Sequence, residues 1–580
     1  MLSFKHLLIL LSVIYFGVNC APKTQSTEWP LVKTKSGELL GKIDTTLLDQ
    51  REFYSFQGIP YAEAPIGALR FRAPRPIQPW VGVRNATQYG SKCLQTTFNL
   101  SQFWGEENCL FLNVYTPNLT PIEKMPVIFF VHGGGYMSGG SSWHAGDILL
   151  DEDIVLVTIN YRLGPFGFLS LNTADYSGNM GLKDQLLALK WVNDNIEFFG
   201  GNKNSITMFG QSTGASSVHL FTLIPQTQSL YKRAIASSGS MLCPWSYSKK
   251  NHTQILQKLI ADEKSTPIEN ISLNDIVEYL KNVDGPIFGE RTFAPVYESG
   301  KSIKEIDLVW APVIEIETGD DALLTRPIES YLDEKSDIDS LFGYTSAESI
   351  ILAPTDINFP DGLKTFEERF EVQLPLIDLN YSYFSKDYDN MIKDVRQFYF
   401  GDKPVDANSL QEFVKLLSDV FFIYGIDKSV KAQAKRSTGK TFCYQFSVEL
   451  ELNSLRKTAN ASTLGLSGAT HIEDMLYLFR MDAFIPESRA YDDFRLNTPE
   501  GQMTKKIVKF FTNFVKFGNP IPNNDPIEVK PVTVDAVNYV DLTNNGPIVG
   551  TNPHIKYIQF WDDFLHKYKD ILQTPNGIQL

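Results

Sequence analysis

One short sequence constrains the fold of this chain more than any other: the G-x-S-x-G pattern at Gly210–Gly214. The residues before it, Ser205–Phe209, are apolar and β-branched and predict a buried strand. The residues after it, Ala215–Ile224, have the length of a helix that ends before Pro225. A strand that turns sharply into a helix needs glycines where backbones approach closely, and it strains the residue between them. The pattern therefore predicts that Ser212 is exposed at the carboxyl edge of a sheet, above the start of a helix.

Further strands and helices alternate along the chain. Met125–Val131 and Ile154–Ile159 are continuous apolar runs of the buried-strand type, and Lys232–Ser240 predicts another strand and turn. Asp184–Ile196 has the length and apolar content of a helix. This alternation predicts the α/β class, with a large, mostly parallel central sheet covered by helices on both faces.

Length and charge narrow the domain organisation and the partners. The 580 residues, 43% of them hydrophobic, are ample for a large buried core. No linker, charge block or repeat divides them, so we expect one domain over residues 21–580. The net charge of −14 repels phosphate backbones, which argues against nucleic acid as a partner.

The first twenty residues, Met1–Cys20, have the pattern of a secretory signal peptide. Lys5 gives a positive start, and Leu7–Val18 is an apolar run too short to span a bilayer comfortably. The last residues, Tyr568–Leu580, are polar and carry no lipid-anchor tail. The sequence thus predicts a secreted, extracellular protein without a membrane anchor.

Secretion makes N-glycosylation and disulfide bonds relevant. Seven N-x-[ST] sequons occur, at Asn85, Asn99, Asn118, Asn251, Asn270, Asn380 and Asn460. Without Cys20, four cysteines remain. Cys93 and Cys109 are close in a loop-rich stretch and are expected to form a disulfide bond, whereas Cys243 and Cys443 are expected to be free thiols.

A serine hydroxyl needs a neighbouring base to act as a nucleophile, and near neutral pH that base is histidine. His471 lies in a loop directly before the apolar run Met475–Phe479, which is predicted to begin a helix. The local roles or surroundings of the other seven histidines make each of them a weaker candidate for the base. These are His6, His132, His144, His219, His252, His554 and His566. His471 is therefore the candidate base by elimination.

Two more segments complete a candidate site. Three consecutive glycines, Gly133–Gly135, follow the strand Met125–Val131, and their N–H groups can turn toward one point and bind an oxyanion; the alternative is an ordinary glycine turn. Glu348 follows the strand-like run Ser340–Tyr344 and gives the order serine, acid, histidine along the chain. The alternative for Glu348 is an exposed loop glutamate.

Taken together, these residues resemble the type-B carboxylesterase and cholinesterase family over nearly the whole mature chain. The segments that carry the resemblance include the surroundings of Glu348 and His471 and the motifs Phe56–Ala62, Leu69–Phe71, Glu107–Tyr115, His132–Tyr136, Asn160–Arg162, Gly178–Gln185 and Gly210–Gly214. The resemblance implies an α/β-hydrolase fold with a deep active-site gorge and no metal or cofactor.

The resemblance also implies roles for individual residues. It assigns Ser212 as the nucleophile, His471 as general base and then acid, and Glu348 as the carboxylate that orients the imidazole. The family's remaining site features map onto oxyanion donors at Gly134, Gly135 and Thr213, a Cys93–Cys109 bridge, and structural ion pairs Arg70–Glu107 and Arg162–Asp184.

The chain departs from the family at several positions. Thr213 replaces the alanine that usually follows the nucleophile, and its branched side chain is expected to crowd the acyl group. Ser349 stands where glycine is common, and the second bridge around Cys243 is missing. No tryptophan matches the one that holds a quaternary ammonium in cholinesterases, since Trp104 is displaced within the short Cys93–Cys109 loop. A choline ester substrate is therefore not expected.

The form of several motifs favours the insect juvenile hormone esterases within this family. These are Gln211 in the elbow, Arg70-Phe71, Asp184-Gln185 and the spacing Gly468-x-x-His471-x-x-Asp474. The sequence thus predicts a secreted serine carboxylesterase that hydrolyses small-molecule carboxylic esters through an acyl-enzyme. Alternatives are an esterase for odorants, pheromones or xenobiotics and, in another class, a non-catalytic binding or adhesion protein on the same fold.

Overall fold

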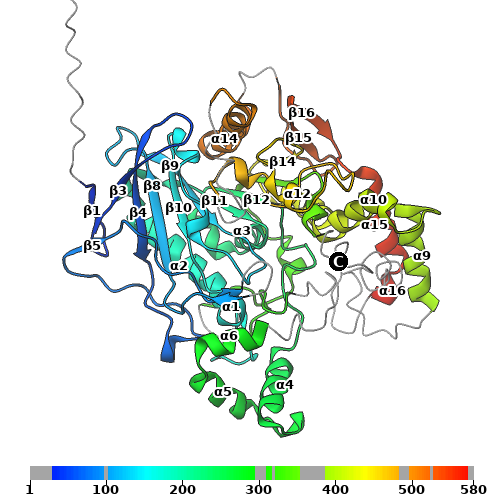
Figure 1. Cartoon of the computed structure of the whole chain (residues 1–580), viewed down its shortest axis with the longest axis horizontal. Helices are drawn as coiled ribbons and strands as arrows, with labels where there is room; N and C mark the ends of the chain where they lie inside the picture. The colour runs from blue at the N-terminus through cyan, green and yellow to red at the C-terminus, as the bar shows by residue number, and fades with distance from the viewer. Residues whose placement is uncertain are drawn as a thin grey trace, which may run out of the picture.

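A computed structural model of the protein describes residues 29–96, 102–293, 308–316, 321–352, 386–481, 496–522 and 527–572. Its centre is an eleven-stranded sheet in the order β16-β15-β14-β13-β12-β11-β9-β10-β8-β4-β3 (Figure 1). The strands, in chain order, are β3 Lys42–Thr45, β4 Glu52–Pro60, β8 Phe111–Thr116, β9 Met125–Val131, β10 Val155–Ile159, β11 Gly201–Gln211, β12 Arg233–Ser237, β13 Asp339–Thr345, β14 Thr441–Phe446, β15 Asn538–Thr543 and β16 Gly546–Thr551.

The sheet is parallel from β10 to β15 and antiparallel toward both edges. β9 pairs in parallel with β10 and β11, and the parallel pairing continues through β12, β13 and β14 to β15. β3, β4, β8 and β16 join by antiparallel pairing. The predicted mostly parallel sheet is confirmed, and the carboxyl ends of its central strands lie along one edge.

The apolar runs of the central strands are explained by burial on both faces. In β9, Val127, Phe129 and Val131 belong to one hydrophobic core, whereas Ile128 and Phe130 belong to the other. Successive side chains of a strand point to opposite faces, so a strand between two helical layers must be apolar at every position.

Helices form the two outer layers (Figure 1). α2 and α3 contribute to the first core, and α14 contributes to the second core, on the other face of the sheet. The described helices are α1 Gly164–Phe168, α2 Met180–Asn195, α3 Thr213–Leu223, α4 His252–Lys264, α5 Leu273–Asn282, α6 Gly285–Phe293, α9 Lys386–Phe400, α10 Leu410–Ser418, α11 Tyr424–Arg436, α12 Ser454–Thr458, α14 Pro499–Phe517, α15 Ile555–Lys567 and α16 Lys569–Leu572.

Most predicted elements agree with the structure, but Met475–Phe479 does not begin an α-helix. The segment forms only a 3₁₀ turn, Met475–Tyr477. All five side chains of Met475–Phe479 are buried. Such a run lacks the polar face that an amphipathic helix would turn toward solvent.

Both edge strands of the sheet carry residues that interrupt further pairing. β16 contains Pro547, which has no N–H group to donate. On the opposite edge, β3 carries Lys42 and Asp44, whose side chains form an ion pair at 3.1 Å. Charge and proline on an edge strand disfavour pairing with another strand.

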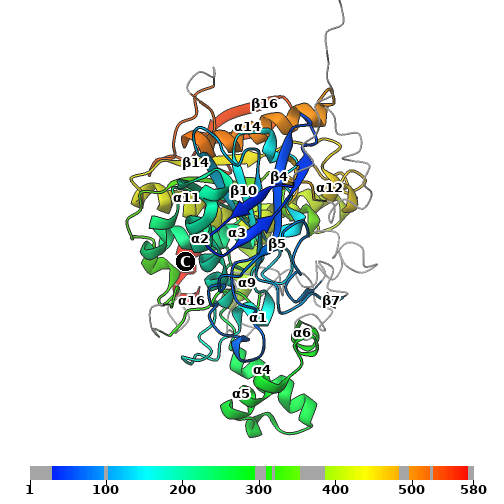
Figure 2. The same ribbon diagram turned by 90° about the vertical axis from the view of Figure 1, so that its left-hand side faces the viewer.

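A group of three helices extends away from the sheet. Figure 2 shows α4, α5 and α6 at the foot of the molecule. α5 begins with a capping box in which Ser272 and Asp275 exchange hydrogen bonds, and Ile276 and Leu280 face inward. Across the described residues, no helix combines the length and the apolar character needed to cross a bilayer.

Candidate active site

Ser212 lies in the sharp turn between β11 and α3. Its φ of 57° and ψ of −125° are a strained combination that costs about 1–3 kcal/mol for a residue with a side chain. Gly214 makes the turn possible, because a Cβ there would lie 2.1 Å from the carbonyl oxygen of Val131. The N–H of Ser212 donates to the carbonyl oxygen of Ser237 at 2.8 Å. The turn therefore holds Ser212 at the carboxyl ends of β11 and β12.

Glu348 and His471 come together from the segments that follow β13 and β14. His471 Nδ1 lies 2.6 Å from Glu348 Oε2, and Glu348 Oε1 accepts from the N–H of Thr345 at 2.8 Å. The N–H of His471 and the hydroxyl of Thr470 both donate to the carbonyl oxygen of Glu348, each at 3.1 Å. Glu348 is fully buried, so it is not the exposed loop glutamate of the alternative interpretation.

This geometry fixes the tautomer of the imidazole. A buried carboxylate needs hydrogen-bond donors, and Glu348 receives one from His471 at Nδ1. In the neutral imidazole the proton is then on Nδ1, and Nε2 is left as the acceptor. Nε2 faces the elbow, where the side-chain nitrogen of Gln211 lies 3.2 Å away.

Phe422 covers the imidazole. Its ring centroid lies 4.8 Å from that of His471. Phe422 belongs to a π-helical turn, Asp419–Ile423, inserted between α10 and α11. The turn is fixed by Trp245, whose indole N–H donates to the carbonyl oxygen of Phe421 at 2.7 Å. Turns of this kind often occur at functional sites, and this one places an aromatic ring over the candidate base.

The glycine loop after β9 lies against the elbow. A Cβ on Gly133 would lie 2.8 Å from Cβ of Ser212. Gly134 has a φ of 112°, and a Cβ there would lie 2.1 Å from the carbonyl oxygen of Ser138. Within the described part of the chain, the N–H groups of Gly134, Gly135 and Thr213 donate to no protein acceptor. Three amides beside the serine are thus available to an oxyanion.

Thr213 packs beneath this loop. Its side chain is 1% exposed, and its hydroxyl oxygen lies 3.4 Å from the N–H nitrogen of Tyr136. The side chain therefore faces the glycine loop rather than standing free beside the serine.

Asp474 is a second buried carboxylate near the imidazole. Its Oδ2 accepts from the hydroxyl of Ser237 at 2.6 Å and from that of Tyr444 at 2.9 Å. Burial raises the pKa of Asp474 from 3.8 to about 6, although the Ser237 hydroxyl opposes the rise and Glu348 adds to it. The sequence offered only the three-residue spacing from His471 as a signal for this residue.

Three other described histidines near the sheet are structural. His132 stacks on Tyr161 with ring centroids 4.4 Å apart, and burial lowers its pKa to about 4. His219 accepts from the N–H of Met241 at 3.1 Å, and burial lowers its pKa to about 3. His144 packs against Phe130 at 4.6 Å. These three imidazoles are neutral at physiological pH.

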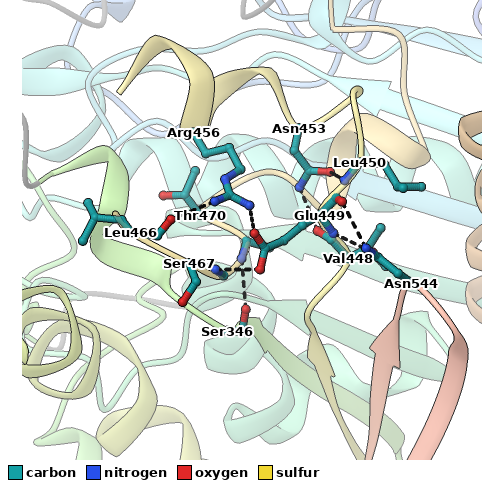
Figure 3. A network of polar contacts seen from close by, with 12 residues as sticks. Ser346, Val448, Glu449, Leu450, Asn453, Arg456, Leu466, Ser467, Thr470 and Asn544 are labelled. Carbon is teal, nitrogen blue, oxygen red and sulfur yellow. Dashed lines mark hydrogen bonds and ion pairs between the residues drawn. The ribbon is translucent and has the colours of Figure 1, made fainter. Parts of the chain in front are cut away.

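The loop that carries His471 is tied to α12 and to the chain before it (Figure 3). Glu449 forms an ion pair with Arg456 and accepts from the N–H of Gly468 at 2.8 Å. Arg456 Nη2 also donates to the carbonyl oxygen of Leu466 at 2.9 Å. The ion pair thus holds the loop at two points shortly before His471.

A second carboxylate holds the same loop from the other side. Glu473 accepts from the N–H of Thr470 at 2.9 Å and from the side chain of Asn453 at 2.8 Å. The N–H of Arg456 donates to the other oxygen of Glu473 at 2.9 Å. The residues on both sides of His471 are therefore bonded to α12 or to its N-cap residue, Asn453.

The predicted ion pairs and the disulfide bond are present. Arg70 and Glu107 pair at 2.6 Å, and the fully enclosed pair Arg162–Asp184 lies at 2.7 Å. Cys93 and Cys109 form a disulfide bond. The other two described cysteines, Cys243 and Cys443, are buried free thiols.

Trp104 lies within the disulfide loop and contacts a lysine. The ammonium of Lys92 lies 5.0 Å from the Trp104 ring and 4.6 Å from the Trp143 ring. Burial lowers the pKa of Lys92 to about 8, while the two indoles favour its charged form. One face of Trp104 is thus already occupied by a cation of the protein itself.

Five of the seven sequons can be located. Asn85, Asn118, Asn251, Asn270 and Asn460 are all exposed. Asn99, Asn380 and the predicted signal peptide lie outside the described residues.

Comparison with known proteins identifies the family. The sequence model of the carboxylesterase family matches residues 28–561. Esterase E4 of Myzus persicae is 35% identical, covering 90% of this chain and 92% of the aphid protein. The juvenile hormone esterase of Tribolium castaneum is 33% identical, covering 86% of this chain and 85% of the beetle protein.

A solved esterase structure has the same fold. The crystal structure of juvenile hormone esterase from Manduca sexta, with OTFP covalently attached, superposes with a TM-score of 0.77. It is 27% identical in sequence, covering 93% of this chain and 100% of that chain. The protein therefore belongs to the carboxylesterase family: it has an α/β-hydrolase fold and is a hydrolase of small-molecule carboxylic esters.

Proposed function

We propose that this esterase is a secreted serine carboxylesterase in which Ser212, His471 and Glu348 form the catalytic triad. The observation that carries the proposal is the pair of contacts on the imidazole. Glu348 binds Nδ1 at 2.6 Å, and the residue before Ser212 meets Nε2 at 3.2 Å. A general base for a serine needs this arrangement, with a carboxylate at one ring nitrogen and the other ring nitrogen facing the segment of the nucleophile.

The proposed acylation begins when His471 Nε2 takes the proton of the Ser212 hydroxyl and Oγ attacks the ester carbonyl. The charge that develops on the carbonyl oxygen is stabilised by the N–H groups of Gly134, Gly135 and Thr213, each worth about 2–4 kcal/mol of the barrier. The imidazolium then protonates the leaving alcohol, and the acyl group remains on Ser212.

Deacylation repeats these steps with water. His471 takes a proton from water, the hydroxide oxygen attacks the acyl carbon, and Ser212 leaves with the proton returned by the imidazolium. The acid product is released and the enzyme is restored. The buried Glu348 keeps its hydrogen bond to Nδ1 and stabilises the imidazolium in both halves of the reaction.

The juvenile hormone esterases of Tribolium castaneum and Manduca sexta support a related ester as substrate. The Lys92 ammonium over Trp104 argues against a choline ester, since that indole face already binds a cation. Comparison of kcat/KM for methyl, acetyl and long-acyl esters distinguishes a hormone-like ester from odorant, pheromone or xenobiotic esters.

The decisive variant is Ser212→Ala, with Ser216→Ala as the matched control. Ser216 lies in α3, the helix that begins directly after Ser212, and its hydroxyl donates to the carbonyl oxygen of Ser240 at 2.9 Å. We expect Ser212→Ala to lose about 10⁴-fold or more in kcat on an aryl ester, together with labelling by a fluorophosphonate probe. Full turnover by Ser212→Ala would refute the triad, and a folded wild-type protein that resists labelling would favour a binding or adhesion role.

A further inference from the structure

The side chain of Gln211 is enclosed at the centre of the site. Gln211 is only 5% exposed, and its amide nitrogen lies 3.2 Å from Nε2 of His471. Its amide oxygen faces the glycine loop, since a Cβ on Gly133 would lie 2.6 Å from it. The amide thus lies between the imidazole and the glycine loop, whose N–H groups are the proposed oxyanion donors.

The contact at Nε2 has only one chemical form. An amide nitrogen donates and does not accept, so Nε2 of His471 must accept the hydrogen bond. The proton of the neutral imidazole is on Nδ1, toward Glu348, which leaves one lone pair, on Nε2. The hydroxyl of Ser212 needs that same lone pair to be activated.

We propose that Gln211 is a positioning residue that holds the resting imidazole in its neutral form and competes with Ser212 for Nε2. This inference rests on the proposed triad. Two effects follow from it. The amide slows attack by Ser212 until it moves off Nε2, and its donated hydrogen bond can form only with the neutral imidazole.

Few groups around the imidazole can alter its charge. Among the described residues, the charged groups shown to interact with it are Glu348, from the segment after β13, and Asp474, at the start of the 3₁₀ turn Met475–Tyr477. Phe422, from the π-helical turn, is uncharged. Substitution of Gln211 leaves these three side chains unchanged. A difference between the variants and wild type therefore reports the altered contact at Nε2.

The experiment compares Gln211→Met, which keeps the length but removes the donor, with Gln211→Glu, which places a carboxylate at Nε2. Gln433→Met is the matched control. Gln433 is a buried amide whose nitrogen donates to the hydroxyl of Ser340 at 3.1 Å, near the opposite end of β13 from Glu348. The readout is the second-order rate of fluorophosphonate labelling from pH 5 to pH 9, with thermal unfolding of each variant.

For Gln211→Met we expect a plateau rate about fivefold above wild type, the factor that one hydrogen bond of ordinary net strength represents. We also expect its acid limb to move to higher pH, and that of Gln211→Glu to move further, by about one pH unit or more, because a carboxylate favours the imidazolium. Gln433→Met should keep the wild-type plateau and acid limb.

A Gln211→Met plateau no higher than wild type, or an acid limb that does not move, would overturn the competition. This failure is distinguishable from failure of the triad itself. If Ser212→Ala is inactive and unlabelled while Gln211→Met behaves as wild type, only the role of Gln211 is wrong. If Ser212→Ala remains active, the proposed function fails.

Discussion

The Asp474 carboxylate is buried beside the His471–Glu348 pair, yet it is bound by different groups, the hydroxyls of Ser237 and Tyr444. Burial raises its pKa from 3.8 to about 6 in the folded protein. An acid with a raised folded-state pKa contributes its full stability below the unfolded pKa and loses it as pH rises toward the folded pKa. Above about pH 6, the folded state therefore contains an ionised carboxylate at a cost of about 1–3 kcal/mol.

Asp474→Asn removes this cost and retains an oxygen that accepts from both hydroxyls. We expect the variant to raise the free energy of unfolding by about 1–3 kcal/mol at pH 7.5 and to change it little at pH 4. Urea unfolding at the two pH values measures both quantities. The same change in stability at both would show that the carboxylate is not ionised across this range.

At the residue scale, a position could be predicted from the sequence where a motif encodes it. Ser212 was predicted from its own flanking strand and helix, and the family pattern pointed to Glu348 and His471. The contact between Gln211 and His471 was not predictable, because the two residues are 260 positions apart and meet only when the sheet has formed. The ring of Phe422 over His471 had no sequence signal, since a π-helical turn leaves no recognised pattern.

At the scale of elements, the short helix α12 anchors the loop that carries His471. The Glu449–Arg456 ion pair and Glu473 bind the loop on either side of His471, so small shifts of α12 are transmitted to the imidazole. A displacement of about 1 Å in a catalytic group can cost about 10²-fold in rate.

Glu449→Gln tests whether this anchoring positions the imidazole. It removes the charge that binds Arg456, and we expect kcat to fall about tenfold while KM changes little, because only the position of the His471 imidazole is disturbed. Glu451→Gln is the control, since Glu451 pairs with Lys457 of the same helix but is exposed, and such pairs contribute about 0–1 kcal/mol. Equal kcat values for the two variants would show that the Glu449–Arg456 ion pair does not position His471.

The elements themselves were largely predictable. Met125–Val131 is a strand with the bounds that its apolar run indicated, and β10 begins one residue later than the run Ile154–Ile159, because a doubly buried strand leaves a continuous signal. The helix predicted to begin at Met475–Phe479 was wrong for a related reason. A continuous apolar run does not distinguish a helix from a buried irregular segment. Its structure depends on how the chain around His471 is anchored, which no local pattern reports.

At the scale of the whole molecule, we expect secretory processing. Expressed in eukaryotic cells, the protein should appear in the medium with Ala21 as its first residue and with N-glycans on exposed sequons such as Asn118. Thr120→Ala breaks that sequon and should remove one glycan mass step, whereas Thr120→Ser preserves it. Mass spectrometry of the intact protein measures the steps, and an intracellular chain that retains residues 1–20 would contradict the prediction.

The two outer strands of the central sheet limit how copies of this enzyme can associate. Proline in β16 and the paired charges of β3 leave neither border suited to growth by strand addition. Assembly of two copies would therefore have to use surfaces other than the outer strands of this sheet. The largest structural element of the protein thus resists amyloid-like stacking through its edges.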